Sequence, residues 1–487
     1  MSDPEPPRNE RPTGCGAAAL GRRVARRAFL KGTLGTGTIF LLAACAPAAP
    51  PAAPTGAPAQ KAPAMDQPVS IEVWHTEPNP VTKQAMDNII ARFQQKHPNV
   101  TVTQAPQGWA DMEKKILAGI AAGTLPEISQ AIQYVTPSLQ AKDLLLPLDD
   151  VIDSIGKDNI FPHVRDTATL LDGQWWGITH AWGADVWIYR GDIADRKGLK
   201  EPRTWGELLD FVKALHEAEP GMAGIQLAGT PGYFVNEDFY MFTGQDGGQV
   251  WTTDGKPNFT SRQSLATLTL FKDLVPYQPK GWLTQSWIDT NVNLAKGNVA
   301  MISGYGRSIG IVRDNIPPEQ VTPERFRIMR YKPVGPDNAE PPEKGMRTQL
   351  DGEHWVVYKS SKNPEWALEF LKFFFEKPNY LEYTNSVPLH LLPIDIRLFR
   401  DPEYTEEPLR KQWKSLLDVQ FDYMDKKLAW PLLMLQQSDA RIPYIAEVAN
   451  SGTIADMVYD VVDKGLSPEG AADKQQKRTD QLIRDLK

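Results

Sequence analysis

The chain contains very little cysteine, because Cys15 and Cys45 are the only two among its 487 residues. Two thiols exclude a disulfide framework, a thiolate zinc cage and an iron–sulfur site, and they allow one bridge at most. The seven histidines are scattered, without a His-x-His or His-Glu-x-x-His pattern, so no zinc site is indicated. We therefore expect no metal and no cofactor, and a fold that depends on buried apolar surface.

Excess positive charge is also missing. Lys and Arg number 53 against 60 Asp and Glu, which gives a formal net charge of -7. Proteins that bind nucleic acid usually present a basic patch, so we expect no nucleic-acid partner. The sequence has no phosphate-binding G-x-x-x-x-G-K-[ST] motif, and ATP hydrolysis would therefore belong to a partner. The length and the 41% hydrophobic content predict a globular protein of two or three domains.

Residues 1–44 have the pattern of an export signal. A basic stretch precedes an apolar run from about residue 32 to 44, which is too short for a stable membrane anchor. Arg26 and Arg27, followed by Ala-Phe-Leu-Lys, resemble the twin-arginine motif of Tat export, which we prefer to the Sec route. Leu-Ala-Ala-Cys45 resembles a lipobox, in which Cys45 is lipidated and becomes the first mature residue.

The segment that follows, residues 45–68, is rich in Pro and Ala and has few large apolar side chains to bury. Such a composition favours a semi-extended tether over a folded domain. The signal and the tether together predict an extracytoplasmic lipoprotein, with a folded part held outside the cell membrane by its lipid anchor.

The folded part begins with alternating strands and helices. Apolar spacing predicts strands at 69–74 and 100–103, with helices at 85–93 and 112–120, which favours an α/β fold with a parallel sheet. Further along, the pattern predicts strands at 186–189 and 299–303 and helices at 204–215 and 364–375. Residues 229–260 are rich in Gly, Asn and aromatic residues, and we expect a loop-rich surface around a cleft there.

Six short motifs in this order resemble the family 1 extracellular solute-binding proteins, the carbohydrate-type receptors of bacterial ABC importers. The motifs are SIEVWH from Ser70, AAGTLPEI from Ala121, DGQWWGI from Asp172, IYR from Ile188, RTWGEL from Arg203 and KGNVAMISG from Lys296. The sequence departs from the family pattern at Glu127, Thr179 and Arg190, where Asp, Pro and Asn are usual.

The resemblance implies a two-lobed periplasmic-binding-protein fold of type II, with the ligand in a cleft between the lobes. It implies an N-lobe at 69–178 and 304–360, and a C-lobe at 179–303 and 361–487. It also implies a monomer that binds a carbohydrate, delivers it to an ABC transporter permease and performs no chemistry.

Aromatic residues are abundant, with 14 Trp in the chain. A pyranose has an apolar face that stacks on flat rings and a hydroxyl rim that needs polar partners. From this mixture of residue types, and from the positions where the family presents ligand-facing loops, we expect a binding site formed by His75, Gln107, Trp109, Trp182, Asp185, Tyr233, Tyr305, Arg307, Glu353, His354 and Trp355. Burial in the core is the alternative for each Trp, and a surface ion pair is the alternative for Arg307.

Two other functions stay open at this point. Gly306-Arg307-Ser308-Ile309-Gly310 fits the G-x-S-x-G pattern of a hydrolase nucleophile elbow, so an exported enzyme acting on sugars is one alternative. Four residues separate Ser308 from the end of the predicted strand at Ser303, whereas an elbow places its serine directly there. A ligand sensor built on the same fold is the other alternative.

Overall fold

A computed structural model describes residues 68–487, apart from 134, 167–168, 431–443 and 487, and apart from the side chains of 109, 110 and 446. The expected export signal and tether, with Arg26, Arg27 and Cys45, lie outside these residues. None of the described helices is long and apolar enough to cross a membrane.

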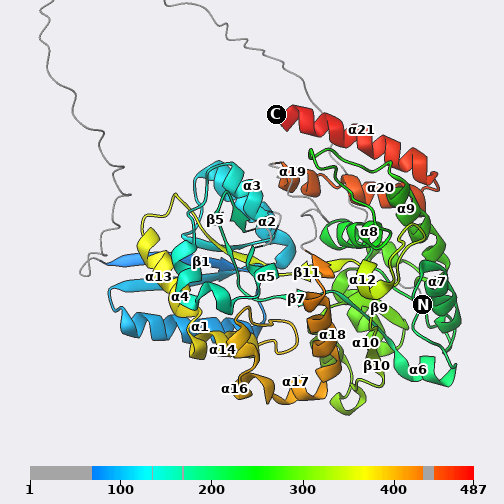
Figure 1. Ribbon diagram of the computed structural model, residues 1–487, viewed down its shortest axis with the longest axis horizontal. Coiled ribbons are helices and arrows are strands. Elements are labelled where there is room, and N and C mark those ends of the chain that lie inside the picture. Colours follow the sequence, from blue (N-terminus) through cyan, green and yellow to red (C-terminus); the bar gives the residue numbers. More distant parts are fainter. Residues whose placement is uncertain (1–67, 134, 167–168, 431–443, 487) are drawn as a thin grey trace, which may run out of the picture. The chain divides into compact units, whose positions relative to one another are not determined.

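Five strands in the order β2-β1-β3-β12-β6 form a mixed sheet, in which the first two pairings are parallel and the last two antiparallel. Figure 1 labels its strand β1. β1 (Val69–His75) pairs in parallel with β2 (Val100–Pro106) and with β3 (Ile128–Ala131). β12 (His354–Val357) joins antiparallel to β3, and β6 (Ile178–Thr179) pairs with β12. The predicted strand–helix–strand unit is therefore present, and it is extended by strands from two distant segments.

Helices α1 (Pro80–Lys96) and α2 (Trp109–Ala122) connect these strands. The side chain of Asn79 caps α1 by accepting a hydrogen bond from the Thr82 amide at 2.8 Å. The buried face of α1 includes the predicted Ala85, Met86, Ile89, Ile90 and Phe93. The cap fixes where α1 begins, and the loop between β1 and α1 borders the cavity described below.

A second, three-stranded sheet has the order β10-β8-β9. β8 (Val186–Arg190) is central and pairs antiparallel with β9 (Met301–Gly304) and with β10 (Phe326–Ile328). Helices α8 (Tyr233–Gln245), α10 (Trp287–Lys296) and α11 (Gly306–Asn315) belong to this part of the chain. The predicted helix at 204–215 is α7 (Trp205–Leu215), capped by Thr204.

Two short strands link the sheets. β7 (Gly183–Ala184) lies between β6 and β8 in the sequence, and β11 (Thr348–Asp351) directly precedes β12. They pair antiparallel, and β13 (Ala429–Trp430) pairs with β11 on its other side. The chain therefore passes from one main sheet to the other on adjacent strands, a connection that suits a hinge.

The remaining helices and strands surround the two sheets. Around the first part lie α3 (Val135–Ala141), α4 (Asp149–Ile155), α5 (Pro162–Asp166), β4 (Leu170–Leu171) and β5 (Gln174–Trp175). The middle of the chain adds α6 (Gly191–Arg196), α9 (Arg262–Leu274) and α12 (Pro342–Gly345). The C-terminal part contains α13 (Pro364–Phe374), α14 (Lys377–Asn385), α15 (Ile396–Phe399), α16 (Pro402–Thr405), α17 (Pro408–Gln412), α18 (Lys414–Asp425), α19 (Ile445–Asn450), α20 (Thr453–Val462) and α21 (Pro468–Leu486).

The expected lobe boundaries agree with the strand pairing only in part. β10, which falls in the expected N-lobe segment 304–360, pairs with β8 of the second sheet. α13, which falls in the expected C-lobe segment 361–487, packs against α1 and α4. The boundaries came from the resemblance to the family, which did not specify the partner strand of β10 or the helices that α13 packs against. The division into lobes stays a prediction.

The expectation of a loop-rich surface at 229–260 is wrong for its centre. Residues 233–245 form α8, and Val235 to Gln245 are buried along its length. The helix follows Gly232, whose φ of 137° suits only glycine. Because polar residues such as Glu237 and Asp238 are buried in α8 along with its aromatic residues, its sequence lacks the periodicity of an amphipathic helix.

Candidate functional site

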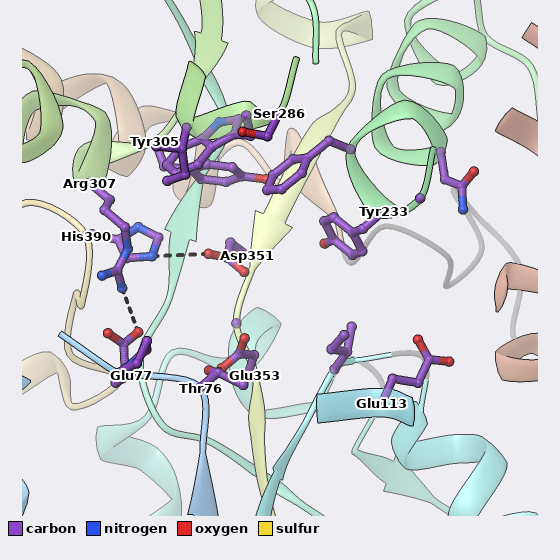
Figure 2. Close-up of a pocket in the computed structure, with 18 of the residues that line it drawn as sticks. Thr76, Glu77, Glu113, Tyr233, Ser286, Tyr305, Arg307, Asp351, Glu353 and His390 are labelled. Atoms are coloured by element: carbon purple, nitrogen blue, oxygen red, sulfur yellow. Dashed lines mark hydrogen bonds and ion pairs between the residues drawn. The ribbon is translucent and has the colours of Figure 1, made fainter. Parts of the chain in front are cut away.

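A cavity of about 640 Å³ lies where both main sheets and their helices contribute residues (Figure 2). One wall comes from the loop after β1, from α2, from the segment after β6 and from the β11–β12 connection. The other wall comes from the first turns of α8, α10 and α11. The cavity therefore lies at the carboxyl ends of parallel strands, where open α/β sheets bind ligands.

Glu353, in the β11–β12 connection, is a polar residue that lines one wall of the cavity. Its Oε2 accepts a hydrogen bond from the Thr76 hydroxyl at 2.5 Å and lies 3.4 Å from His180 Nε2. Thr76 follows β1, and His180 follows β6. The register of the sheet therefore brings three polar side chains from distant segments together. Glu353 Oε1 accepts no hydrogen bond from the part of the chain that the structure describes.

An ion pair joins the two walls. Arg307, in the first turn of α11, donates to Glu77 Oε1 at 2.6 Å, and Glu77 follows β1 (Figure 2). The Glu77 side chain is only 6% exposed and that of Arg307 24%. Burial raises the pKa of Glu77, and the positive charge of Arg307 opposes this effect.

Asp351, at the end of β11, lies between Tyr305 and Glu353 in Figure 2. Burial, followed by the charge of Glu353, raises its pKa to about 8, although Arg307 acts in the opposite direction. Its partner is His390, with Nε2 at 3.4 Å. Burial holds the pKa of His390 well below the usual value, so a neutral imidazole faces this carboxyl group.

The position of His390 depends on one glycine. A Cβ atom at residue 306 would lie 1.7 Å from the carbonyl oxygen of Leu389, so only Gly306 lets the two segments approach this closely. The same glycine begins α11 and precedes Arg307. A single close contact thus places the histidine and the arginine beside the carboxylates.

Three aromatic rings form the opposite wall. Phe234 in α8 and Trp287 in α10 stack with their centroids 5.4 Å apart and their planes at 8°. The Tyr305 ring lies 6.1 Å from Trp287 at 61°. Trp287 is the first residue of α10, which a reciprocal hydrogen-bond pair between Ser286 and Asp289 caps. These rings offer flat apolar surface to a ligand.

A buried polar layer lies behind the aromatic wall. The Tyr305 hydroxyl donates to Glu237, whose pKa is raised well above the usual value by burial. Nearby, Asp185 forms an ion pair with Lys332 and accepts a hydrogen bond from Ser303 at 2.9 Å. Lys332 is fully buried. This layer fixes the orientation of Tyr305.

Five of the expected binding residues line the cavity, namely Trp182, Tyr233, Tyr305, Arg307 and Glu353. The residues His75, Gln107, Asp185, His354 and Trp355 are not among the side chains that line it. The side chain of Trp109 lies outside the described part of the structure. The role of these residues in binding stays a prediction.

Each expected residue away from the cavity has a structural environment of its own. Trp355 is fully buried in β12, with Phe374 at 5.6 Å from its ring. His75 contacts Gln104 at 2.7 Å, and burial lowers its pKa to about 4. His354 contacts Thr136 at 2.8 Å. The side chain of Gln107 donates to the Ala105 carbonyl at 3.2 Å.

Sequence reasoning did not select Glu77, Phe234, Trp287, Asp351 or His390, all of which line the cavity. Phe234 and Asp351 lie within segments that mix aromatic and polar residues, which is a usable signal. Trp287 follows a Ser-x-x-Asp capping pattern that places it at the start of a helix. Glu77 and His390 carry no local signal, because only the tertiary structure brings them to the cavity.

The candidate hydrolase serine has a structural role. Ser308 is fully buried in α11, and its hydroxyl accepts a hydrogen bond from the Tyr305 amide at 3.1 Å. The Ser308 amide in turn donates to the Tyr305 carbonyl at 2.9 Å, so Ser308 helps to close the first turn of the helix. The described residues also contain no group of three or more His, Cys, Asp or Glu side chains that could hold a metal ion.

Residues 88–412 match the model of a protein family described as bacterial extracellular solute-binding protein. The Escherichia coli (strain K12) protein YcjN is 21% identical over 419 residues, which cover 85% of this chain and 93% of that protein. The lactose-binding protein of Rhizobium radiobacter is 24% identical over 63% of this chain and 70% of its own length.

Solved structures show the same fold. An ABC transporter solute-binding protein from Thermotoga lettingae TMO, bound with alpha-D-tagatose, has a TM-score of 0.69 at 19% identity. The match covers 85% of this chain and 99% of that one. Maltose-bound MalE3 of T. maritima has a TM-score of 0.68 at 20% identity, over 85% and 100% of the two chains. The predicted α/β fold of the periplasmic-binding-protein type is therefore confirmed.

Proposed function

Because this chain belongs to the bacterial extracellular solute-binding protein family, we propose that it captures a carbohydrate and delivers it to an ABC transporter permease. Membership confirms the family that the six motifs resemble, and with it a binding protein rather than an enzyme. The proposal goes beyond family membership in two respects, namely that the ligand is a carbohydrate and that it is delivered to a permease.

One observation carries the carbohydrate assignment: stacked aromatic rings face carboxylates across a single cavity. Phe234 and Trp287 offer ring faces for the apolar C–H surface of a sugar. Glu353 and Asp351, on the other wall, accept hydrogen bonds from its hydroxyl rim. A volume of about 640 Å³ is within the usual range for small-ligand sites. Tagatose, maltose and lactose, bound by the relatives named above, belong to the same ligand class.

The proposal includes a hinge between two lobes. The ligand would contact both walls and favour the state in which they are close together. In this state Arg307 reaches Glu77, and the adjacent strands β7 and β11 allow the walls to separate. X-ray scattering with and without sugar tests this step, because closure reduces the radius of gyration. An unchanged radius on saturation with sugar would contradict it.

Export and anchoring complete the proposal. We infer that the chain acts as a monomer outside the cytoplasm, exported through Arg26 and Arg27 and held at the membrane by a lipid on Cys45. Replacing both arginines with lysine should retain the precursor inside the cell. Cys45→Ala should release soluble protein into the medium or periplasm. Normal processing of the lysine variant would contradict the Tat assignment.

Calorimetric titration with neutral mono-, di- and trisaccharides tests binding, and chromatography of the same mixtures detects cleavage. We expect saturable binding with one site and no new sugar products. Cleavage that depends on the protein would favour the hydrolase alternative, and absence of binding to any sugar would contradict the carbohydrate assignment.

A further inference from the structure

We propose that the carbohydrate bound in this cavity carries a basic amine, and that its ammonium group sits between Asp351 and Glu353. This inference rests on the proposed function and specifies the ligand class of the same site. The inference narrows the ligand class to amino sugars, because aromatic rings and hydroxyl acceptors alone would equally suit neutral sugars.

The first argument is the balance of charge on one wall. Glu77, Asp351 and Glu353 all line the cavity. Arg307 faces them, but it is bound to Glu77 at 2.6 Å. Lys114, in α2, also lines the cavity, and it lies 3.9 Å from Asp111. Asp351 and Glu353 therefore share a site in which no described lysine or arginine forms a salt bridge with either of them.

The second argument is a set of buried polar atoms on cavity-lining residues that have no hydrogen-bond partner among the described residues. Glu353 Oε1 and Asn236 Oδ1 are such acceptors, on residues only 6% and 4% exposed. In the tautomer that donates Nε2–H to Asp351, His390 Nδ1 is a third acceptor. Trp287 Nε1 is a donor at this cavity. Acceptors predominate, so the complementary ligand is rich in donors.

An ammonium group matches this site better than a hydroxyl group does. A hydroxyl group donates one hydrogen bond and supplies no charge, so Asp351 keeps its proton beside it. An ammonium group donates three hydrogen bonds and supplies the positive charge that lets Asp351 ionise next to Glu353. In the free protein the raised pKa of Asp351 keeps this carboxyl group largely protonated at neutral pH. A bound ammonium group would take the place of that proton, which leaves to solvent.

The replacement of the Asp351 proton by an ammonium group depends on the titratable groups around Asp351 and Glu353. His180 Nε2 lies 3.4 Å from Glu353 Oε2, and Glu353 Oε1 has no hydrogen-bond partner among the described residues. Glu353 and Glu77 raise the pKa of Asp351, and Arg307 lowers it. His390, on the adjacent loop, is neutral because burial lowers its pKa, and the pKa of the Tyr305 phenol is raised well above its usual value. Asp351 and Glu353 are therefore the groups whose negative charge a ligand cation can compensate.

The experiment compares matched sugars that differ at one position. Glucose, glucosamine and N-acetylglucosamine carry a hydroxyl, an amine and an acetamide at carbon 2, and their β-linked dimers and trimers extend each series. We expect the amine to bind at least about tenfold more tightly than its neutral counterparts at about pH 7. The affinity of the amine should rise about tenfold per unit between about pH 5 and 7, since one proton leaves on binding.

Asp351→Asn should bring the ratio of amine to neutral affinity close to one and remove the pH slope. Glu353→Gln is the second variant, and it should reduce the same ratio. Asp418→Asn, on the exposed face of α18 where Asp418 pairs with Lys414, is the matched control and should leave ratio and slope as in the wild type. Melting curves confirm that each variant is folded.

The outcomes separate the two proposals. If neutral sugars bind as tightly as the amino sugars and the affinity has no pH slope, the proposal of an amine-bearing ligand is overturned, whereas the proposed carbohydrate function stands. An amine preference that persists in both Asp351→Asn and Glu353→Gln would also overturn the assigned position. Failure of all the sugars to bind would contradict the carbohydrate function itself, and the amine with it.

Discussion

The two walls of the cavity differ in chemistry and in how the chain builds them. One wall presents Glu77, Asp351 and Glu353 from loops at strand ends. The other presents Phe234, Trp287 and Tyr305 from the starts of helices or the residue before one. A strand end fixes the direction of a short polar side chain through sheet register. The rings depend on where three helices begin, and of these α10 is capped by Ser286 and Asp289 whereas α8 has no side-chain cap. One wall is therefore set by strand pairing and the other by helix starts.

The comparison also explains which aromatic residues can contact a ligand. Trp355 lies within β12, a strand paired on both sides, so its ring is buried in the core. Trp287 stands at a helix start and lines the cavity. Trp355 and Trp287 are chemically identical side chains, and their different positions, inside a paired strand and at the start of a helix, determine whether the ring contacts the core or the cavity.

The largest effect is expected from Trp355→Ala, which removes a fully buried ring from the first sheet. We expect a loss of about 3 to 5 kcal/mol in the free energy of unfolding, as for other large-to-small core substitutions. Urea unfolding of the ligand-free protein measures this loss. A stable variant that no longer binds sugar would place Trp355 at the ligand and break the distinction between the two tryptophans.

Trp287→Ala should instead weaken sugar binding by about 1 to 3 kcal/mol, the usual cost of losing an aromatic anchor at a binding site. The free energy of unfolding should change far less than in Trp355→Ala. Calorimetric titration measures the affinity, and Trp287→Phe is the control because it keeps a flat ring for stacking. Unchanged affinity in the alanine variant would remove the aromatic wall from the binding site.

The carboxylate wall should lower the stability of the free protein. Asp351, with its side chain 22% exposed, has a pKa raised from 3.8 to about 8. Between about pH 4 and 8 the unfolded chain has therefore lost a proton that the folded chain keeps, and stability falls as the pH rises. Asp351→Asn should be more stable than the wild type by about 1 to 2 kcal/mol at pH 8.

Denaturation of both proteins at several pH values measures this effect. The advantage of Asp351→Asn should be smallest near pH 4 and grow toward pH 8. A constant difference between the two proteins would mean that Asp351 titrates in its ordinary range, and the electrostatic contrast between the walls would be lost.

Much of the fold could be predicted from the sequence because its signals are local. Apolar spacing predicted α1 and α13, and the Thr-x-x-Glu pattern at 204–207 predicted the start of α7. The buried α8 lacked such a signal. The strand that β10 pairs with and the helices that α13 packs against are distant in the sequence, and composition carries no information about such contacts.

The site shows the same limit. Tyr233 and Glu353 were expected in the site because their segments mix aromatic and polar residues. Tyr305 was expected from the ligand-facing loops of the family and Arg307 as a hydrogen-bond donor, and all four line the cavity. Glu77 and His390 were not expected. Glu77 is one acid among 60, and only the close contact at Gly306 brings His390 to the cavity. A residue type that is common along the chain becomes informative only when its neighbours in space are known.

The smallest effect concerns the bond that joins the walls. Glu77→Gln keeps an oxygen acceptor for Arg307 but removes the negative charge, so a charge-assisted hydrogen bond becomes an ordinary one. The difference between these two kinds of bond is about 1 kcal/mol. The equilibrium constant for bringing the walls together should fall about fivefold, and the apparent affinity for sugar by up to about the same factor. Scattering of the ligand-free variant should show a radius of gyration larger than that of the wild type.

Arg92→Lys, which weakens an ion pair between Arg92 and Glu382 outside the cavity, is the matched control and should change neither the radius of gyration nor the affinity for sugar. Equal radii and affinities in Glu77→Gln and the wild type would mean that the ion pair makes no contribution to closure, and that the two walls approach each other through the ligand alone.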